Sequence, residues 1–279
     1  NQAYAPFANG CRPGCCLVGI EIDSNTIENA ILTLLQGKRA CRVFVGATIC
    51  FNALPLNCGS LTMNAIRSVL VFTWIVITVI PVGLTLVFCS LFLSDIRLWW
   101  WFAAPWLRGV IGAARIVGRV NYRVHGESNL PAADDMRRVI LCPKHQSTWE
   151  TFFFASFTSH PLAYVFKKEL LRVPIFGWVM GRLGMIHIDR KQRIDAWAKV
   201  RAQGEVLMDR GKWIIMFPEG TRGERGKKGN YKAGATRLAE ATGAYIVPIA
   251  VTSARCWPRR SFSLIPGTID VSIGPPVCA

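Results

Sequence analysis

Two short segments of this chain carry residue types that can perform acid–base chemistry next to an anionic group. In the first, residues 145–150 read His-Gln-Ser-Thr-Trp-Glu, which places a carboxylate five positions after an imidazole. A carboxylate that binds one imidazole nitrogen fixes the tautomer of the ring and leaves the other nitrogen free to act as a base. The alternative is that His145 caps the following helix, while the Glu150 carboxylate only interacts favourably with the positive end of the helix dipole.

The position of His145 decides whether the two side chains can meet. Within one helix, residues five apart point about 140° away from each other. His145 follows the apolar stretch 139–142 and so lies at the carboxyl end of a predicted strand, where open α/β sheets bind ligands. Ser147 and Thr148 are favoured N-cap residues, so a helix is expected to begin there with Glu150 in its first turn. We therefore expect the histidine in the turn before the helix, within reach of the carboxylate.

The second segment, residues 217–222, reads Phe-Pro-Glu-Gly-Thr-Arg and follows another apolar stretch at 213–216. Its proline and glycine predict a turn at the carboxyl end of a strand. Arg222 is suited to bidentate contact with phosphate, and Thr221 can add a hydroxyl donor. The basic residues that follow indicate either the rim of an anion-binding site or an ordinary solvated loop.

A third candidate site lies just after a predicted strand at 185–188, where Arg190 could provide a second phosphate clamp. His187 alternates with apolar residues in that strand and could simply face the other side of the sheet. Together with Arg222, Arg190 would supply guanidinium groups from two strand ends.

Beyond residue 120 the sequence alternates short apolar, β-branched segments with longer helical segments. This alternation predicts an α/β domain with a largely parallel sheet flanked by helices. The expected strands cover residues 138–142, 163–166, 185–188, 213–217 and 245–251. The expected helices cover residues 148–158, 175–182, 191–210 and 232–242.

The composition is both basic and apolar. The 279 residues include 33 Lys and Arg against 17 Asp and Glu, a formal net charge of +16, and 51% are hydrophobic. Basic proteins bind anionic lipid surfaces or nucleic acid. The high hydrophobic content favours a membrane partner and argues against nucleic acid.

A long apolar run precedes the predicted α/β domain. The 27 positions that begin at Ser68 carry no charge, and a helix of about 20 apolar residues can cross a bilayer. Pro81 and Gly83 interrupt the run, so the anchor expected at 66–94 either spans the membrane or re-enters it. The next segment mixes tryptophan with arginine, which is typical of a helix at the lipid headgroups, here over 96–118.

These features divide the chain into three parts. Residues 1–62 lack sustained periodicity, and we expect an upstream or non-native extension with the natural start at Met63. Residues 63–119 are the expected anchor and interfacial helices, and residues 120–279 form the α/β domain. Six of the ten cysteines lie in the first part, but no second pair stands at zinc-ligand spacing, so we expect free thiols and no metal site.

Four motifs, taken in order, resemble those of the glycerolipid acyltransferase family, in particular the members that acylate 1-acyl-glycerol-3-phosphate. In chain order they match residues 145–150, 168–190, 217–222 and 247–249. The resemblance covers roughly residues 66–275. Within this range the four motifs follow a hydrophobic N-terminal segment, as they do in the family. Glu150 departs from the commonest pattern, which has Asp there, but the charge is kept.

The resemblance implies transfer of a fatty acyl group from acyl-CoA or acyl carrier protein to the sn-2 hydroxyl of 1-acyl-glycerol-3-phosphate (lysophosphatidic acid). The product would be phosphatidic acid, made for phospholipid biosynthesis. His145 would act as general base, and Glu150 would orient it and stabilise the imidazolium. No metal and no cofactor would be needed beyond the acyl donor. The substrate would be held by Arg190, Glu219, Gly220, Thr221 and Arg222.

Two alternatives stay open at the level of the sequence. The family motifs do not select the acceptor, so the first is a sibling enzyme that acts on glycerol-3-phosphate or a lyso-ornithine lipid. The second is a non-catalytic basic protein that binds membranes or nucleic acid, which explains the charge but not the ordered motifs. Positive residues after the apolar run place the α/β domain on the cytoplasmic side of a bacterial-type inner membrane.

Overall fold

The structure is a computed structural model that describes residues 58–189, 193–227 and 229–278. Its strands are β1 (Val120–His125), β2 (Val139–Pro143), β3 (Leu162–Lys167), β4 (Ile186–Ile188), β5 (Trp213–Ile215), β6 (Tyr245–Val251), β7 (Gly267–Ile273) and β8 (Val277–Cys278). Within this part of the chain they form one sheet with the order β1-β7-β6-β2-β5-β3-β4, and β8 pairs with β6. Neighbours in this order are parallel except for β6 and β7, and β8 is also antiparallel to β6. The predicted α/β class with a largely parallel sheet is confirmed.

The helices of the described residues fall into a group before the sheet and a group between its strands. The first group is α2 (Cys58–Cys89), α3 (Asp95–Leu98), a π-helical segment η1 (Trp99–Ala103) and α4 (Ala104–Ile116). The second group is α5 (Trp149–Phe157), α6 (Phe176–Arg182), α7 (Arg193–Asp209) and α8 (Gly234–Thr242). Short 3₁₀ turns are η2 (Glu127–Asn129), η3 (Lys168–Arg172) and η4 (Ser253–Arg255).

The five predicted strands and four predicted helices of the α/β domain are all present, with ends that differ by a few residues. Strands β1, β7 and β8 were not predicted. In β7, the buried residues Ile269, Val271 and Ile273 alternate with polar ones, which is a recognisable strand pattern. Strand β1 follows Gly118 and shows the weaker alternation of a strand at the edge of the sheet.

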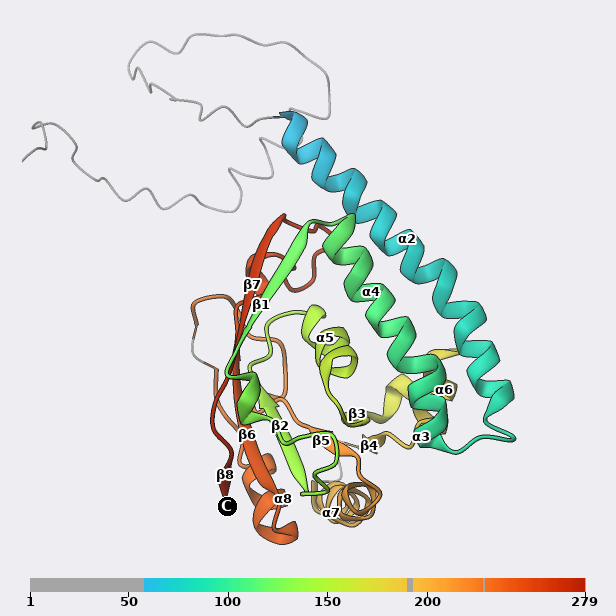
Figure 1. Ribbon diagram of the computed structural model, residues 1–279, viewed down its shortest axis with the longest axis vertical. Helices are drawn as coiled ribbons and strands as arrows, with labels where there is room; N and C mark the ends of the chain where they lie inside the picture. Colours follow the sequence, from blue (N-terminus) through green and yellow to red (C-terminus); the bar gives the residue numbers. More distant parts are fainter. Residues whose placement is uncertain (1–57, 190–192, 228, 279) are drawn as a thin grey trace, which may run out of the picture. The chain divides into compact units, whose positions relative to one another are not determined.

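The central strands are buried on both faces, as the continuous apolar runs in β2 and β5 indicate. Helices α2, α4 and α5 lie together on one side of the sheet, and α7 and α8 lie by the ends of β4, β5 and β6 (Figure 1). Because β2 and β5 are parallel neighbours, their carboxyl ends meet at one edge of the sheet. The loops that follow these two strands carry the two segments singled out above.

Helix α2 is continuous through Pro81, so Pro81 and Gly83 do not interrupt it, and the chain turns only after Cys89. It packs along α4, where Trp106 Nε1 donates to Thr78 Oγ1 at 3.0 Å. It also approaches α6 closely at Gly83, because a Cβ at that position would lie 2.5 Å from Ile175 Cγ2. The predicted extension at residues 1–62 lies almost entirely outside the described residues, and a division of the chain at Met63 stays a prediction.

The segment predicted as one interfacial helix over 96–118 is helical, but its tryptophans do not share one environment. The chain passes from α3 through the π-helical segment into α4, which shifts the register of the side chains. Trp99 is buried and Trp101 is 65% exposed. The tryptophan cluster is therefore partly core, because the π-helical segment turns Trp99 toward the domain.

A buried ion pair connects the turn after α2 to the sheet. Lys212, which precedes β5, donates from Nζ to Asp95 Oδ2 at 2.6 Å and to the Leu183 carbonyl at 2.8 Å. Only 2% of the Lys212 side chain is exposed, and this burial lowers its pKa, with the Asp95 carboxylate acting in the opposite direction. The pair therefore connects the first residue of α3 to the residue that precedes β5.

Replacing Lys212 by methionine is expected to lower the free energy of unfolding by about 3 kcal/mol, since the Asp95 side chain would lose its ion-pair partner at a largely buried position. Denaturant unfolding in detergent measures this difference. Arg210→Met, at an exposed neighbour, should have almost no effect. Adding Asp95→Asn to Lys212→Met should restore part of the loss, and a double variant no more stable than the single one would contradict the role of the pair.

Candidate active site

His145 lies in the turn between β2 and α5, as expected from its position after the strand. Its Nδ1 lies 2.8 Å from Glu150 Oε2, and the carboxylate is in the first turn of α5. The Glu150 side chain is fully buried, whereas 13% of the His145 side chain is exposed. With Nδ1 donating to the carboxylate, Nε2 is the nitrogen left to accept a proton.

Glu150 is held by several donors besides the imidazole. Its oxygens accept hydrogen bonds from the backbone N–H of Gln146 at 2.9 Å and of Ser147 at 3.0 Å. The hydroxyl of Ser253, in η4, also donates to Glu150 Oε1. Ser253 was not predicted, because it stands 103 residues away and no local spacing signals the contact. These bonds fix the orientation of the carboxylate and, through it, of the imidazole.

The second segment closes over the first. The ring of Phe217 stacks on His145 with centroids 3.8 Å apart, and Gly223 N donates to the His145 carbonyl at 2.7 Å. Between them, Gly220 has a φ of +64° and its N–H bonds to the Phe217 carbonyl. A side chain at this left-handed position would be strained, so the turn that presents Thr221 and Arg222 depends on glycine.

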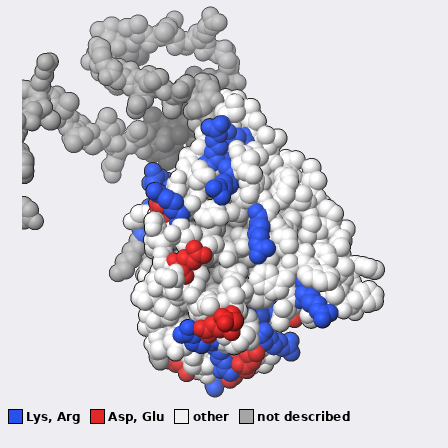
Figure 2. Space-filling view, in the orientation of Figure 1, with Lys and Arg blue, Asp and Glu red and all other residues white. Residues whose placement is uncertain are grey.

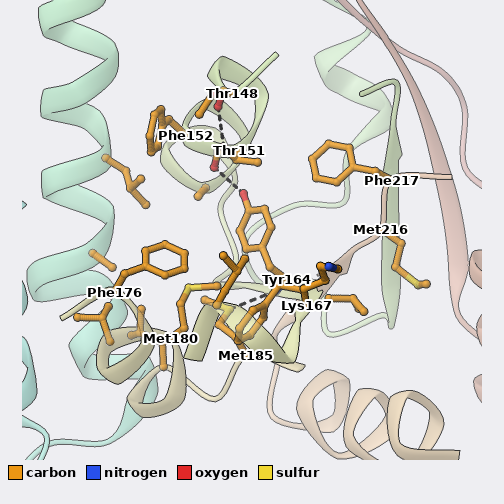
Figure 3. A pocket seen from close by; sticks show the side chains of 18 of the residues that line it. Thr148, Thr151, Phe152, Tyr164, Lys167, Phe176, Met180, Met185, Met216 and Phe217 are labelled. Carbon is orange, nitrogen blue, oxygen red and sulfur yellow. Dashed lines mark hydrogen bonds between the residues drawn. The ribbon is translucent and has the colours of Figure 1, made fainter. Parts of the chain in front are cut away.

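A large apolar cavity of about 1150 Å³ opens beside His145. Figure 3 shows Tyr164 projecting across it toward α5, with Phe176 and Met180 to one side and Met216 and Phe217 to the other. Burial raises the pKa of the Tyr164 phenol, which donates to the Thr151 carbonyl at 2.7 Å. Helix α2 closes part of the wall, so the cavity depends on the N-terminal helices. The α2 residues that line it are Ile75, Val79, Val82, Gly83 and Leu86.

A smaller cavity of about 270 Å³ also borders the histidine, and its lining is mostly polar. It is lined by His145, Gly220, Thr221, Arg222, Arg259 and Arg260. His145, Gly220 and Arg222 line both cavities. The imidazole therefore stands where an apolar space and a cationic space meet.

The structure brings most of the predicted site residues together. Gly220, Thr221 and Arg222 line the polar cavity next to His145. Glu219 turns instead into its own loop, where its buried carboxylate lies 3.7 Å from Lys144 Nζ. Arg190 lies outside the described residues. Arg259 and Arg260 were not predicted, because they follow the last motif and nothing in the sequence links them to His145.

Cys142, three residues before His145, is the nearest thiol along the chain. Burial raises its pKa to about 12, so the thiol stays protonated at neutral pH. A protonated thiol is a poor nucleophile. This agrees with a reaction in which no acyl group is attached to the protein.

Comparison with known proteins identifies the family. A family model described as Acyltransferase matches residues 121–252. The 1-acyl-sn-glycerol-3-phosphate acyltransferase of Pseudomonas aeruginosa is 37% identical over 214 residues, which cover 77% of this chain and 81% of that protein. The protein of the same name from Salmonella typhimurium is 33% identical over 128 residues, 46% of this chain and 52% of that one.

The fold is also found in a solved structure. The crystal structure of the 1-acyl-sn-glycerophosphate acyltransferase PlsC from Thermotoga maritima matches with a TM-score of 0.63 and 20% sequence identity, over 78% of this chain and 87% of that chain. At this identity the likeness concerns the fold alone. Taken with the closer sequence relatives and the four ordered motifs, it leads to one conclusion: the chain belongs to the 1-acyl-sn-glycerol-3-phosphate acyltransferase family of glycerolipid acyltransferases.

Proposed function

We propose that this chain transfers a fatty acyl group from a thioester donor to the free sn-2 hydroxyl of 1-acyl-glycerol-3-phosphate, which yields phosphatidic acid for phospholipid biosynthesis. The observation that carries the proposal is the position of the His145–Glu150 pair at the junction of an apolar cavity and an arginine-lined one. A substrate with an acyl chain and a phosphate needs both environments around its reacting hydroxyl. The relatives with this printed activity support the same acceptor.

In the reaction, Nε2 of His145 takes the proton of the acceptor hydroxyl as the oxygen attacks the thioester carbonyl carbon. The Glu150 carboxylate stabilises the imidazolium that forms. The tetrahedral intermediate then collapses, the carbon–sulfur bond breaks, and the departing thiolate receives the proton from the imidazolium. Transfer is direct, so the chemistry requires no metal or cofactor. Orientation of both substrates at one base supplies several kcal/mol of the rate enhancement.

The apolar cavity is the proposed site for acyl chains. Its volume of about 1150 Å³ slightly exceeds that of typical ligand pockets, which enclose about 300–1,000 Å³. Most of its wall is built from aliphatic and aromatic side chains of α2, α4, α5 and α6 together with β3, while Lys167, Arg222 and Lys232 line it as well. The apolar part of this wall binds hydrocarbon through the hydrophobic effect.

The N-terminal helices are the proposed attachment to the lipid bilayer, from which the acceptor would enter. Among the described residues, Thr62–Cys89 is the one helical stretch long and apolar enough to cross a membrane. Figure 2 shows that the surface over α2 and α4 is largely uncharged, with only scattered Lys and Arg. We place the domain on the cytoplasmic face of a bacterial-type inner membrane, where acyl-CoA and acyl carrier protein are available. The α2 residues more than half exposed include Val69, Leu70, Val76, Ile77 and Phe88.

Thiol release from acyl-CoA by detergent-solubilised protein tests the proposal. Lysophosphatidic acid should support release, while glycerol-3-phosphate and a lyso-ornithine lipid should support little. Release with one of the latter alone would assign the sibling activity. A parallel assay with acyl carrier protein as donor is needed, because absence of release with every acceptor and both donors would refute acyl transfer.

A further inference from the structure

We propose that Arg259 and Arg260 form, together with Arg222, a binding site for a substrate phosphate on the polar side of His145. The inference rests on the proposed acyl transfer but concerns residues beyond the part that the family model matches, which ends at residue 252. The two arginines belong to the segment between η4 and β7, which the fold brings against the turn after β5.

The lining of the cavity selects an anion with several oxygens. Three of its six residues are arginines, and no carboxylate is among the described residues that line it. Each guanidinium offers five N–H groups in a planar fork that matches two oxygens of a phosphate. The cavity of about 270 Å³ has space for a phosphate group but not for an additional acyl chain. Thr221 adds a hydroxyl to the same wall.

Arg259 connects this segment directly to the turn of residues 217–222. Its Nη1 donates a hydrogen bond to the Arg222 carbonyl. The half-buried Arg259 side chain is thereby held in place, and its remaining N–H groups lie at the cavity. The contact makes Arg259 both a ligand and a positioning residue, because it fixes the backbone from which the Arg222 side chain extends.

Arg260 occupies an unfavourable backbone conformation. Its φ is +57°, in the left-handed region that residues with a side chain rarely adopt. Such conformations cost stability and occur preferentially at functional sites. Glycine would adopt this backbone conformation without strain. An arginine at this position is explained by its side chain, which lines the cavity.

The bound phosphate has two chemical sources in this reaction. One is the phosphate monoester of the acceptor, and the other is a phosphate of the acyl donor, from CoA or from the phosphopantetheine arm of a carrier protein. Both substrates must reach His145, and the polar cavity shares that residue with the apolar one. Kinetics with each substrate varied in turn distinguish the two sources.

Steady-state kinetics of Arg259→Ala, Arg260→Gly and Arg260→Lys test the site. We expect KM for one substrate to rise at least about tenfold in the first two variants, with a smaller rise in Arg260→Lys, because a lysine keeps the charge but not the fork. A rise for lysophosphatidic acid assigns the acceptor phosphate, and a rise for the donor assigns the donor phosphate. Arg255→Ala, at an exposed arginine of the same segment that does not line the cavity, is the matched control and should match the wild type.

Folding is separated from binding by thermal unfolding. Arg260→Gly should unfold at the same temperature as the wild type or higher, because glycine adopts a positive φ without strain. Unchanged KM for both substrates, or a fall in kcat alone, would overturn the phosphate site. Binding is also read without turnover: glycerol-3-phosphate should raise the unfolding temperature of the wild type more than that of Arg259→Ala or Arg260→Gly. An inactive wild type that still shows this difference would refute acyl transfer and leave the site standing, whereas equal shifts would refute the site.

Discussion

Replacement of His145 by alanine is expected to lower kcat for acyl transfer by about 10³-fold, within the range of roughly 10²–10⁴ that a general base contributes. This factor corresponds to about 4 kcal/mol of lost transition-state stabilisation. The reason is that no other described side chain of the site combines an imidazole-type base with contact to both cavities. The KM values should change little, since the arginines and the apolar wall remain. Thiol release with lysophosphatidic acid at saturation is the measurement.

The control for this variant is His125→Ala. His125 lies in β1 at the edge of the sheet, and 60% of its side chain is exposed. That variant should keep wild-type kinetics. This result would show that the loss of activity is specific to His145 and does not follow from removing a histidine elsewhere. Thermal unfolding of His145→Ala should remain cooperative, at a temperature lowered by the loss of one hydrogen bond to the buried Glu150 carboxylate. Near-native turnover by His145→Ala would refute its role as base.

Glu150→Gln is expected to lower kcat by a similar factor of about 10³, although the two side chains have almost the same shape. In Ser-His-Asp enzymes the equivalent loss of a carboxylate costs about 10⁴-fold, because the histidine is no longer held in the productive tautomer. Here the carboxylate accepts from His145 Nδ1 and also from two backbone N–H groups and Ser253. A glutamine amide has one accepting oxygen and an NH₂ group that must face one of these donors.

The same substitution should also destabilise the protein by about 1–3 kcal/mol, since buried donors lose their acceptor. Glu150→Asp separates the effect of losing the negative charge from the effect of altered packing. It keeps the carboxylate and shortens the side chain by one methylene. It should retain about ten times more activity than Glu150→Gln, in line with the aspartate that the family usually has. Equal activity of the two variants in the thiol-release assay would show that the negative charge is unimportant and would remove Glu150 from the mechanism.

Local sequence was sufficient for the His145–Glu150 pair. The apolar run of β2 and the N-cap residues Ser147 and Thr148 together predict a turn followed by a helix, and a contact over five residues then depends only on that turn. The parallel α/β class followed in the same way from alternating apolar and helical segments. The long apolar helix α2 was likewise visible, because an uncharged run of that kind is long enough to cross a bilayer as a helix.

Two sequence patterns predicted the structure only in part. The clustered tryptophans after α2 predict an interfacial helix, yet Trp99 is buried because the π-helical segment changes the side-chain direction. Similarly, the acidic residue of the 217–222 turn suggests a ligand to the substrate. In the folded protein the Glu219 carboxylate is buried 3.7 Å from Lys144 Nζ, and its binding to the substrate stays a prediction.

The sequence by itself determined the family motifs, their order, the fold class and the contact between His145 and Glu150. Only the tertiary structure decided which distant residues complete the site. Ser253 reaches Glu150, and Arg259 and Arg260 reach the cavity at His145, because β6 lies directly beside β2 and returns the chain to the same edge of the sheet. Strand pairing joins residues more than a hundred positions apart, and no periodicity or local spacing records which strands become neighbours.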